Sequence, residues 1–478
     1  MKLLTNAKIF PSLNSESILI DKGKIIFIGD KNKINLSLND LDIIDCENKS
    51  ILPGLIDGHC HPLEVVSNMG SIDLSEIKFR SADDLKKYLK NTNCKNKKIL
   101  KFYGFEHRNI KGNLDLKFFD ELNLNIPLII KHRTGHLIFL NSLAIKNLKI
   151  NINDYKFPVD SQKIHQKISN QEQSNFKDNV EKYNKLLMKY GYTTIVDAGV
   201  NNDISKFNTY KNLIKENKLN LNICYMLGNK NVEQFKEIKS NEKLYIGPTK
   251  FIFSEEISMS EIEMILKNHI SISKNDLAFH AISSDIIFKI LHTLYEKLNK
   301  FLGSRLIRLE HATEFLPNTF KVYKDKNLHL IFNPNFIYDH GDFYIKNQED
   351  FDIDSIFNLN DSYKYQFNIG VGTDSPFGSI NPINIISSSI NRTTKSKNII
   401  GNKNKVDLFE IIKAITYGNA KALKKQNKIG TLKVGKNADI IVLNEEISKS
   451  STIDNLQINH TIINGKTEYA RNNNNLIY

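Results

Sequence analysis

The sequence has 478 residues but only four cysteines and no long apolar run, and these absences exclude several classes of protein. The cysteines form no CxxC pair and no regular framework, so we expect a reduced, intracellular protein rather than a disulfide-rich secreted one. No stretch of about 18 apolar residues is present, which argues against a membrane span. The N-terminal segment lacks an apolar signal core and a small-residue cleavage site, so we expect a cytoplasmic location.

A concentrated basic block is also missing, although the formal net charge is +13. Lys and Asn are scattered along the whole chain, for example over 90–98 and 470–478. A nucleic-acid interface concentrates basic side chains together with aromatic ones. The composition therefore favours a solvated basic surface over a nucleic-acid binder. Nucleic-acid binding that vanished at moderate salt and showed no sequence preference would be non-specific.

What the sequence does contain is a long alternation of strand-like and helix-like segments, which predicts a parallel sheet with helical crossovers. The strand-like segments are 52–61, 98–107, 127–136, 193–200, 221–227, 248–255, 276–282, 305–313, 328–336 and 368–376. A barrel of eight strands needs only eight of these ten segments. We therefore assign the segments 98–107 and 127–136 in part to an insertion.

Both ends of the chain are rich in strands instead. The segments 3–10, 17–29 and 41–46 resemble 438–444 and 458–470, with short apolar stretches between polar turns. Asp21-Lys22-Gly23 is a hairpin-like signal between two of these stretches.

Several of the central strands end in a polar residue, and strand ends of a closed parallel barrel converge on one face. His59 and His61 are two positions apart, so on a strand both side chains face the same side and can bind one cation such as Zn²⁺. His280 and His311 end two consecutive strand-helix units, and Asp374 ends a further strand. The competing interpretations are a chance pair in a loop, buried core histidines, and an Asp that caps a helix.

Lys250 lies on another of these strands, 248–255. A lysine facing the interior is costly unless it is paired or modified. The alternative is a rim lysine whose amine reaches solvent.

Six segments resemble the amidohydrolase superfamily, and within it the amidohydrolase 3 (YtcJ-like) family. They keep that family's order and cover nearly the whole chain: PGLIDGHCHP (53–62), 113–145, GYTTIVDAG (191–199), LIRLEHA (306–312), VGTDSPFGSINP (371–382) and IGTLKVGKNADIIVL (429–443). The resemblance implies an α/β fold with a distorted (β/α)₈ barrel, a TIM barrel. It places the barrel at 53–428 with an insertion around 75–170, and a small composite β-sandwich at 1–52 and 429–478.

The resemblance also implies a metal centre. His59 and His61 would hold one divalent metal, and His280 and His311 a second. Lys250 would match the lysine that family members carry as a carbamate bridging both metals, which also answers the cost of burying its amine. We expect two Zn²⁺ per chain, with Fe²⁺ or Mn²⁺ as alternatives.

The implied function is hydrolysis of a non-peptide carbon–nitrogen bond, in an N-substituted amide, a formamide or a cyclic amide, by a metal-activated hydroxide. Asp374 would act as general base and then as general acid. Arg308 and Glu310 would orient His311 from behind. His136 and Asn141, in the family-like stretch 113–145, are candidates for substrate contact. The partner is a small amide-type molecule, and the family also allows a homodimer.

Two alternatives stay open at this point. A mononuclear deaminase of the same superfamily would use His59, His61, His280 and Asp374, but such deaminases place a Glu three residues after the fifth-strand histidine, where this chain has Ser283. A non-catalytic barrel that only binds a ligand is the second. Ser254 and Glu255, where the family commonly has Asp-Gly, also depart from its pattern and bear on the substrate.

Overall fold

The computed structural model describes residues 1–34, 41–75, 77–94, 97–108, 110–133, 135, 137–151, 157–160, 164, 173–238, 240–347, 349, 352–449, 451, 453 and 455–471. The chain divides into two compact units. Unit 1 comprises Met1–His61 and Asn184–Tyr478, and unit 2 comprises Pro62–Tyr183. The domain boundaries proposed from the sequence stay predictions.

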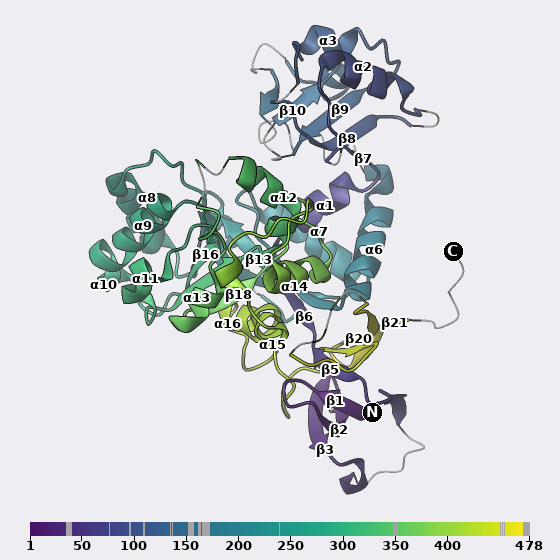
Figure 1. Cartoon of the computed structure of the whole chain (residues 1–478), viewed down its shortest axis with the longest axis vertical. Helices are drawn as coiled ribbons and strands as arrows, with labels where there is room; N and C mark the ends of the chain where they lie inside the picture. The colour runs from purple at the N-terminus through teal and green to yellow at the C-terminus, as the bar shows by residue number, and fades with distance from the viewer. Residues whose placement is uncertain are drawn as a thin grey trace. The chain divides into compact units, whose positions relative to one another are not determined.

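Unit 1 is built around an eight-stranded parallel sheet in the order β18-β17-β16-β15-β14-β13-β12-β6 (Figure 1). Its strands are β6 (Leu55–Cys60), β12 (Tyr192–Asp197), β13 (Asn222–Gly228), β14 (Leu244–Phe251), β15 (Leu277–Ala281), β16 (Ile307–His311), β17 (Leu328–Phe332) and β18 (Asn368–Val371). The sheet curls into a nearly closed barrel. The predicted fold class is therefore confirmed.

The barrel strands are largely buried on both faces, because helices cover their outer side. Every residue of β13, for example, is buried. The helices between and after the strands are α6 (Gln173–Lys189), α7 (Ile204–Lys215), α8 (Met259–Ile272), α9 (Ser284–His292), α10 (Asn299–Leu302), α11 (Pro317–Phe320), α12 (Asn335–Lys346), α13 (Leu359–Lys364), α14 (Pro382–Asn391), α15 (Leu408–Lys413) and α16 (Asn419–Ala422). No helix in the described part of the chain is long and apolar enough to cross a membrane.

Helix starts in the barrel coincide with side chains that can satisfy free backbone N–H groups. Asp203, Ser258 and Ser283 precede α7, α8 and α9, and each side chain accepts a hydrogen bond from a backbone N–H in the first helical turn. These caps fix where each strand end gives way to a helix. The side chains at the strand ends are thereby held at the barrel mouth.

The first and last strands of the barrel, β6 and β18, are joined by one buried side chain rather than by a ladder. Asn419 Nδ2 donates to the carbonyls of Ile56 and Val371, both at 2.7 Å, and its Oδ1 accepts from Val371 N at 3.0 Å. Glycines make room for it. A Cβ at Gly58 or Gly370 would approach Asn419 Oδ1 to 2.6 or 2.2 Å.

Beyond Asn419 the two strand ends bond to each other directly. Asp374 N donates to His59 O at 2.7 Å, and His61 N donates to Ser375 O at 2.8 Å. A Cβ at Gly372 would lie 2.4 Å from His59 N, so the close approach requires glycine there. The closure therefore brings the segment after β18 against the histidines of β6.

Strands from both chain ends form an eight-stranded mixed sheet. They are β1 (Lys2–Ile9), β2 (Asn14–Asp21), β3 (Lys24–Gly29), β4 (Asp42–Asp45), β5 (Ser50–Pro53), β19 (Ile440–Leu443), β20 (Ile458–Ile463) and β21 (Lys466–Ala470). β5 joins the two ends, since it pairs with β1 on one side and with β19 on the other. The expected hairpin is present: Lys22 and Gly23 have positive φ between the antiparallel β2 and β3.

Unit 2 contains a separate five-stranded sheet in the order β11-β10-β9-β8-β7. Its elements are α1 (Pro62–Asn68), β7 (Ile72–Asp73), α2 (Ala82–Asn91), β8 (Leu100–Phe105), α3 (Leu116–Asp120), β9 (Leu128–His132), β10 (Leu137–Leu140), α4 (Ser142–Asn147) and β11 (Val159–Asp160). An aromatic core that includes Phe102, Phe105, Phe119 and Phe139 holds it together. The two strand-like segments set aside from the barrel at 98–136 lie in this sheet.

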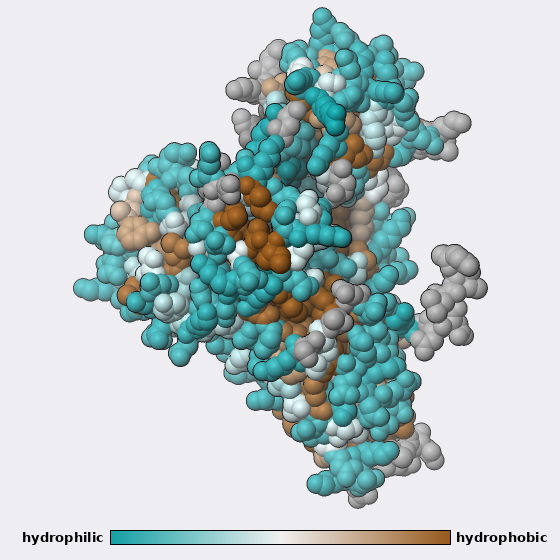
Figure 2. Space-filling view, viewed as in Figure 1, coloured by the Kyte–Doolittle hydropathy of each residue, from teal (hydrophilic) through white to brown (hydrophobic). Residues whose placement is uncertain are grey.

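Figure 2 shows hydrophilic side chains over most of the visible face, with a hydrophobic area near α12 and α14.

We expect Asn419→Ala to destabilise the protein by about 2–4 kcal/mol, because the substitution removes three hydrogen bonds and leaves buried backbone groups unpaired. The measurement is urea unfolding followed by circular dichroism. Asn391→Ala, at an exposed position, is the matched control. A loss equal to that of the control would show that Asn419 does not hold the barrel closed.

Candidate metal centre

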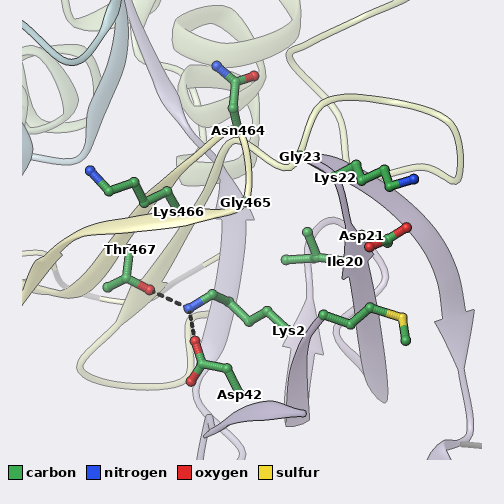
Figure 3. A pocket seen from close by; sticks show the side chains of 11 residues that line it. Lys2, Ile20, Asp21, Lys22, Gly23, Asp42, Asn464, Gly465, Lys466 and Thr467 are labelled. Carbon is green, nitrogen blue, oxygen red and sulfur yellow. Dashed lines mark hydrogen bonds and ion pairs between the residues drawn. The ribbon is translucent and has the colours of Figure 1, made fainter. Parts of the chain in front are cut away.

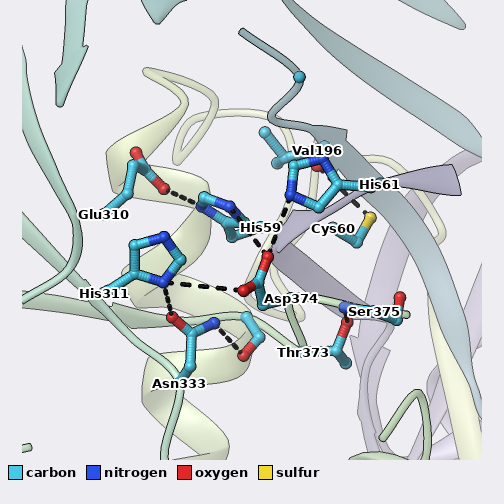
Figure 4. Close-up of polar contacts among 12 residues, drawn as sticks. His59, Cys60, His61, Val196, Glu310, His311, Asn333, Thr373, Asp374 and Ser375 are labelled. Carbon is cyan, nitrogen blue, oxygen red and sulfur yellow. Dashed lines mark hydrogen bonds and ion pairs between the residues drawn. The ribbon is translucent and has the colours of Figure 1, made fainter. Parts of the chain in front are cut away.

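The candidate residues of the barrel gather at the carboxyl ends of its strands. His59 belongs to β6 and His61 follows it, while His280 and His311 belong to β15 and β16. The register of the parallel strands β15 and β16 sets the positions of these histidines: His280 lies beside Glu310, and Ala281 lies beside His311. Figure 4 shows His59, His61 and His311 directed toward one region around Asp374.

Asp374 lies at the centre of this group. Its Oδ1 is 3.3 Å from His59 Nε2 and 3.1 Å from His61 Nε2, and its Oδ2 is 3.9 Å from His311 Nδ1. One ligand atom from each of His59, His311 and Asp374 lies within 4.8 Å of the other two, and all three residues are buried. His280 packs edge-on against His311, with ring centroids 4.6 Å apart.

The backbone is strained at two of these residues. His311 has φ 71° and Asp374 has φ 53°, in the left-handed region that non-glycine residues seldom adopt. Such conformations cost on the order of 1 kcal/mol each and persist where the surroundings impose them. Here they turn two side chains at strand ends toward His59.

A buried ion pair fixes the orientation of His59. Its Nδ1 lies 2.6 Å from Glu310 Oε2, and Arg308 Nε donates to Glu310 Oε1 at 2.6 Å. Burial favours the neutral acid, but Arg308 and Lys250 hold the pKa of Glu310 well below its usual range. The ionised carboxylate therefore accepts a hydrogen bond from the Nδ1–H of His59. It leaves Nε2 to face Asp374.

Two atoms that carry lone pairs then face each other, namely His59 Nε2 and Asp374 Oδ1. Burial and Lys250 oppose a charge on His59, but Asp374 and Glu310 outweigh them and raise its pKa. Burial likewise opposes the charge on Asp374, yet His59 and His61 keep its pKa well below its usual value. The site thus favours positive charge between imidazole and carboxylate, and the donor set of imidazoles and a carboxylate fits a divalent metal.

Asn333 is a residue that the sequence analysis missed. Its Oδ1 lies 2.8 Å from His311 Nδ1, and its Nδ2 donates to Gly372 O at 2.8 Å. It therefore orients His311 and ties it to the segment that carries Asp374. The signal was available, because Asn333 directly follows β17, a strand for which no polar end residue had been proposed.

Asp57 was missed as well, although it lies within the segment PGLIDGHCHP. Its carboxylate accepts from Thr373 Oγ1 at 2.6 Å and from Thr373 N at 2.9 Å, which links β6 to the segment after β18. Burial raises the pKa of Asp57 to about 6, while the bonds from Thr373 oppose that rise.

Lys250 is buried in the barrel, with 2% of its surface exposed. No hydrogen-bond partner for its Nζ is found in the part of the chain that the structure describes. Burial lowers its pKa to about 8, although the charges of Glu310 and Asp374 act in the opposite direction. The positive charge of Lys250 also opposes protonation of His59, His280 and His311.

The two proposed substrate contacts lie elsewhere in the chain. Asn141 caps α4 within unit 2: its Oδ1 accepts from Ala144 N and Leu128 N, and its Nδ2 donates to Ile126 O. This is a structural role, and a substrate contact by Asn141 stays a prediction. His136 lies outside the described residues.

A surface hollow on the terminal sheet holds none of the candidate residues (Figure 3). Lys2 in its wall is engaged by Asp42 and by Thr467. The cluster in the barrel is therefore the candidate centre in unit 1.

Comparisons with known proteins identify a matching family model, related sequences and a related solved structure. The model of the amidohydrolase family Amidohydro_3 matches residues 42–469. The N-substituted formamide deformylase of Arthrobacter pascens is 19% identical, with 98% of both chains covered, and the protein LONG AFTER FAR-RED 3 of Arabidopsis thaliana is 22% identical, with 98% of this chain and 91% of that one covered. A metal-dependent hydrolase from Pyrococcus horikoshii OT3 superposes with a TM-score of 0.73 at 20% identity, covering 94% of this chain and 98% of that one.

We expect His59→Ala to lower the metal content of the purified protein by at least one equivalent per chain, because His59 Nε2 faces the other ligand atoms. The measurement is elemental analysis by mass spectrometry. His292→Ala, on α9, is the control. Unchanged metal content in His59→Ala would rule the histidine out as a ligand.

Asn333→Leu should weaken metal binding roughly 10–100-fold, since it removes the partner that orients His311. Competition with a chelator of known affinity measures the change. Equal affinity in variant and parent would mean that Asn333 only fills space.

Proposed function

Because this chain belongs to the amidohydrolase family, we propose that it hydrolyses a non-peptide carbon–nitrogen bond in a small molecule with the help of a divalent metal. The observation that carries the proposal is the buried group of His59, His311 and Asp374 at the mouth of the barrel. The substrate class we favour is an N-substituted amide, a formamide or a cyclic amide. The name of the Arthrobacter pascens relative supports the formamide among these.

We further propose two Zn²⁺ per chain, held by His59 and His61 and by His280 and His311, with Lys250 carboxylated between them. A buried amine without a hydrogen-bond partner is costly, and its lowered pKa supplies the neutral amine that reacts with carbon dioxide. Such a metal lowers the pKa of a bound water to about 7 and polarises a carbonyl oxygen.

Asp374 is the group that moves protons in this proposal. Its carboxylate is ionised at neutral pH, because His59 and His61 keep its pKa low, so it can accept a proton from the attacking water. It then donates that proton to the leaving nitrogen. Glu310 and Arg308 keep His59 in a single tautomer throughout, and the burial of all three excludes competing water.

A mononuclear deaminase is the second candidate, and one observation weighs against it. Ser283, at the position where such deaminases carry their proton-shuttling Glu, is used to cap α9: its Oγ accepts from Ile286 N at 3.2 Å. The same hydroxyl donates to Glu255. Ser283 therefore provides no carboxylic acid that could transfer a proton at the barrel mouth.

The test is a screen of formamides, N-substituted amides and cyclic amides with protein of known metal content, read out as release of amine or carboxylate. Turnover that disappears on metal removal and returns with Zn²⁺ is the expected result. Release of ammonia from amino-substituted heterocycles alone would favour the deaminase. No turnover of either class in metal-loaded protein would favour a barrel that only binds.

Asp374→Asn should retain metal but lose turnover by roughly 10²–10⁴-fold, because the amide cannot accept the proton. Metal analysis and steady-state kinetics on the same sample separate the two effects. A variant with parental turnover would reject the proton-transfer role.

Lys250→Met should reduce the metal bound in the barrel from two equivalents to one, since the methionine keeps the apolar stem but cannot form a carbamate. Reconstitution of the parent protein with Zn²⁺ should depend on added bicarbonate, and that of the variant should not. Lys267→Met, on the surface of α8, is the control. Two equivalents in Lys250→Met would exclude the carbamate.

A further inference from the structure

Unit 2 carries a second group of metal-ligating side chains. Glu106 and His107 directly follow β8, and His132 is the last residue of β9. These strands pair in parallel, with Phe105 beside His132, so their carboxyl ends bring the three side chains together. One ligand atom from each lies within 4.8 Å of the other two.

Both histidines of this group are in the form that binds metals. Burial lowers the pKa of His107 and of His132, which favours the neutral imidazole that binds metals. The Nδ1 atom of His107 is buried and finds no hydrogen-bond partner among the described residues. Leaving a buried nitrogen in this state is costly, and a coordinated cation removes that cost.

Glu106 supplies the negative charge. Burial opposes its ionisation, but Arg108 outweighs burial and lowers the pKa of Glu106 to about 2. Arg108 donates through Nε to Oε1 at 3.0 Å and through Nη2 to Oε2 at 2.8 Å, and Arg133 Nη1 lies 3.5 Å from Oε2. Arg108 therefore competes with any metal for this carboxylate.

The competition is a weak one. The side chain of Arg108 is 55% exposed, and ion pairs of exposed side chains contribute little because solvent screens them. Its guanidinium can turn into solvent at little cost. Glu106 can then offer an oxygen to a metal while Arg133 continues to balance part of its charge.

We propose that Glu106, His107 and His132 form a second metal site, structural in role, for a divalent transition metal such as Zn²⁺. Two imidazoles and one carboxylate are a common ligand set for this class of ion, and water completes the coordination. Ligand atoms around tetrahedral Zn²⁺ lie about 3.4 Å apart, so these three draw slightly closer on binding. The ion then links the end of β8 to the end of β9.

The test uses the full chain in a His59→Ala/His311→Ala background, stripped of metal and titrated with Zn²⁺ under equilibrium dialysis. We expect one equivalent to bind in this background. Its affinity falls at least tenfold on adding His107→Ala or His132→Ala and does not change on adding His292→Ala. Absence of that equivalent, or its indifference to both substitutions, overturns the proposal.

If the background variant does not fold, the same substitutions are made in the parent chain. Each should then remove one equivalent of bound metal while the metal of the barrel, followed through the His59-dependent fraction, remains. Loss of no metal overturns the proposal in this form too. Neither outcome depends on whether the barrel hydrolyses an amide.

Arg108→Ala gives the sharpest test of Glu106 as a ligand. Removal of the competing guanidinium should tighten Zn²⁺ binding roughly threefold or more, whereas Glu106→Gln should weaken it, because a neutral amide is a poor ligand. Unchanged or weaker binding in Arg108→Ala contradicts ligation by Glu106.

Discussion

The site depends on how the barrel closes. Between β6 and β18 the usual ladder is replaced by the amide of Asn419, and only glycines at 58 and 370 leave space for it. This closure sets the distance between His59 and Asp374, since Asp374 N donates a hydrogen bond to His59 O. A looser closure would separate the imidazole from the carboxylate, and with them the ligands of one metal.

The interior of the barrel also contains an unusual number of ionisable groups for a buried volume. Arg308 and Lys250 are balanced by Glu310 and Asp374, and all four are nearly inaccessible to solvent. Buried ion pairs seldom add stability over apolar residues of the same size, because desolvation offsets their attraction. These groups instead organise the site: Glu310, itself bound by Arg308, orients His59, and His59 and His61 keep the pKa of Asp374 low.

The fold and the strand ends that carry the cluster could be predicted from the sequence. The residues that orient the cluster could not. Strand ends with His or Asp could be read directly, because the carboxyl ends of parallel strands share one face. Asn333 and Asp57 act through partners that are distant in sequence, Gly372 and Thr373, and no local pattern predicts such pairs. Asn141 lies in a segment that resembles the family, and its amide caps α4, so the proposed substrate contact stays a prediction.

The terminal sheet has a consequence for how the chain is made. β5 directly precedes β6, yet its partner β19 lies about 390 residues later in the sequence. At translation rates of roughly 5–20 residues per second, the N-terminal strands wait roughly 20–80 s on the ribosome before their neighbour emerges. During that interval one edge of β5 is open to pairing with other chains. The length of time for which the new chain is open to aggregation at this edge is thus set by its strand topology rather than by its amino-acid composition.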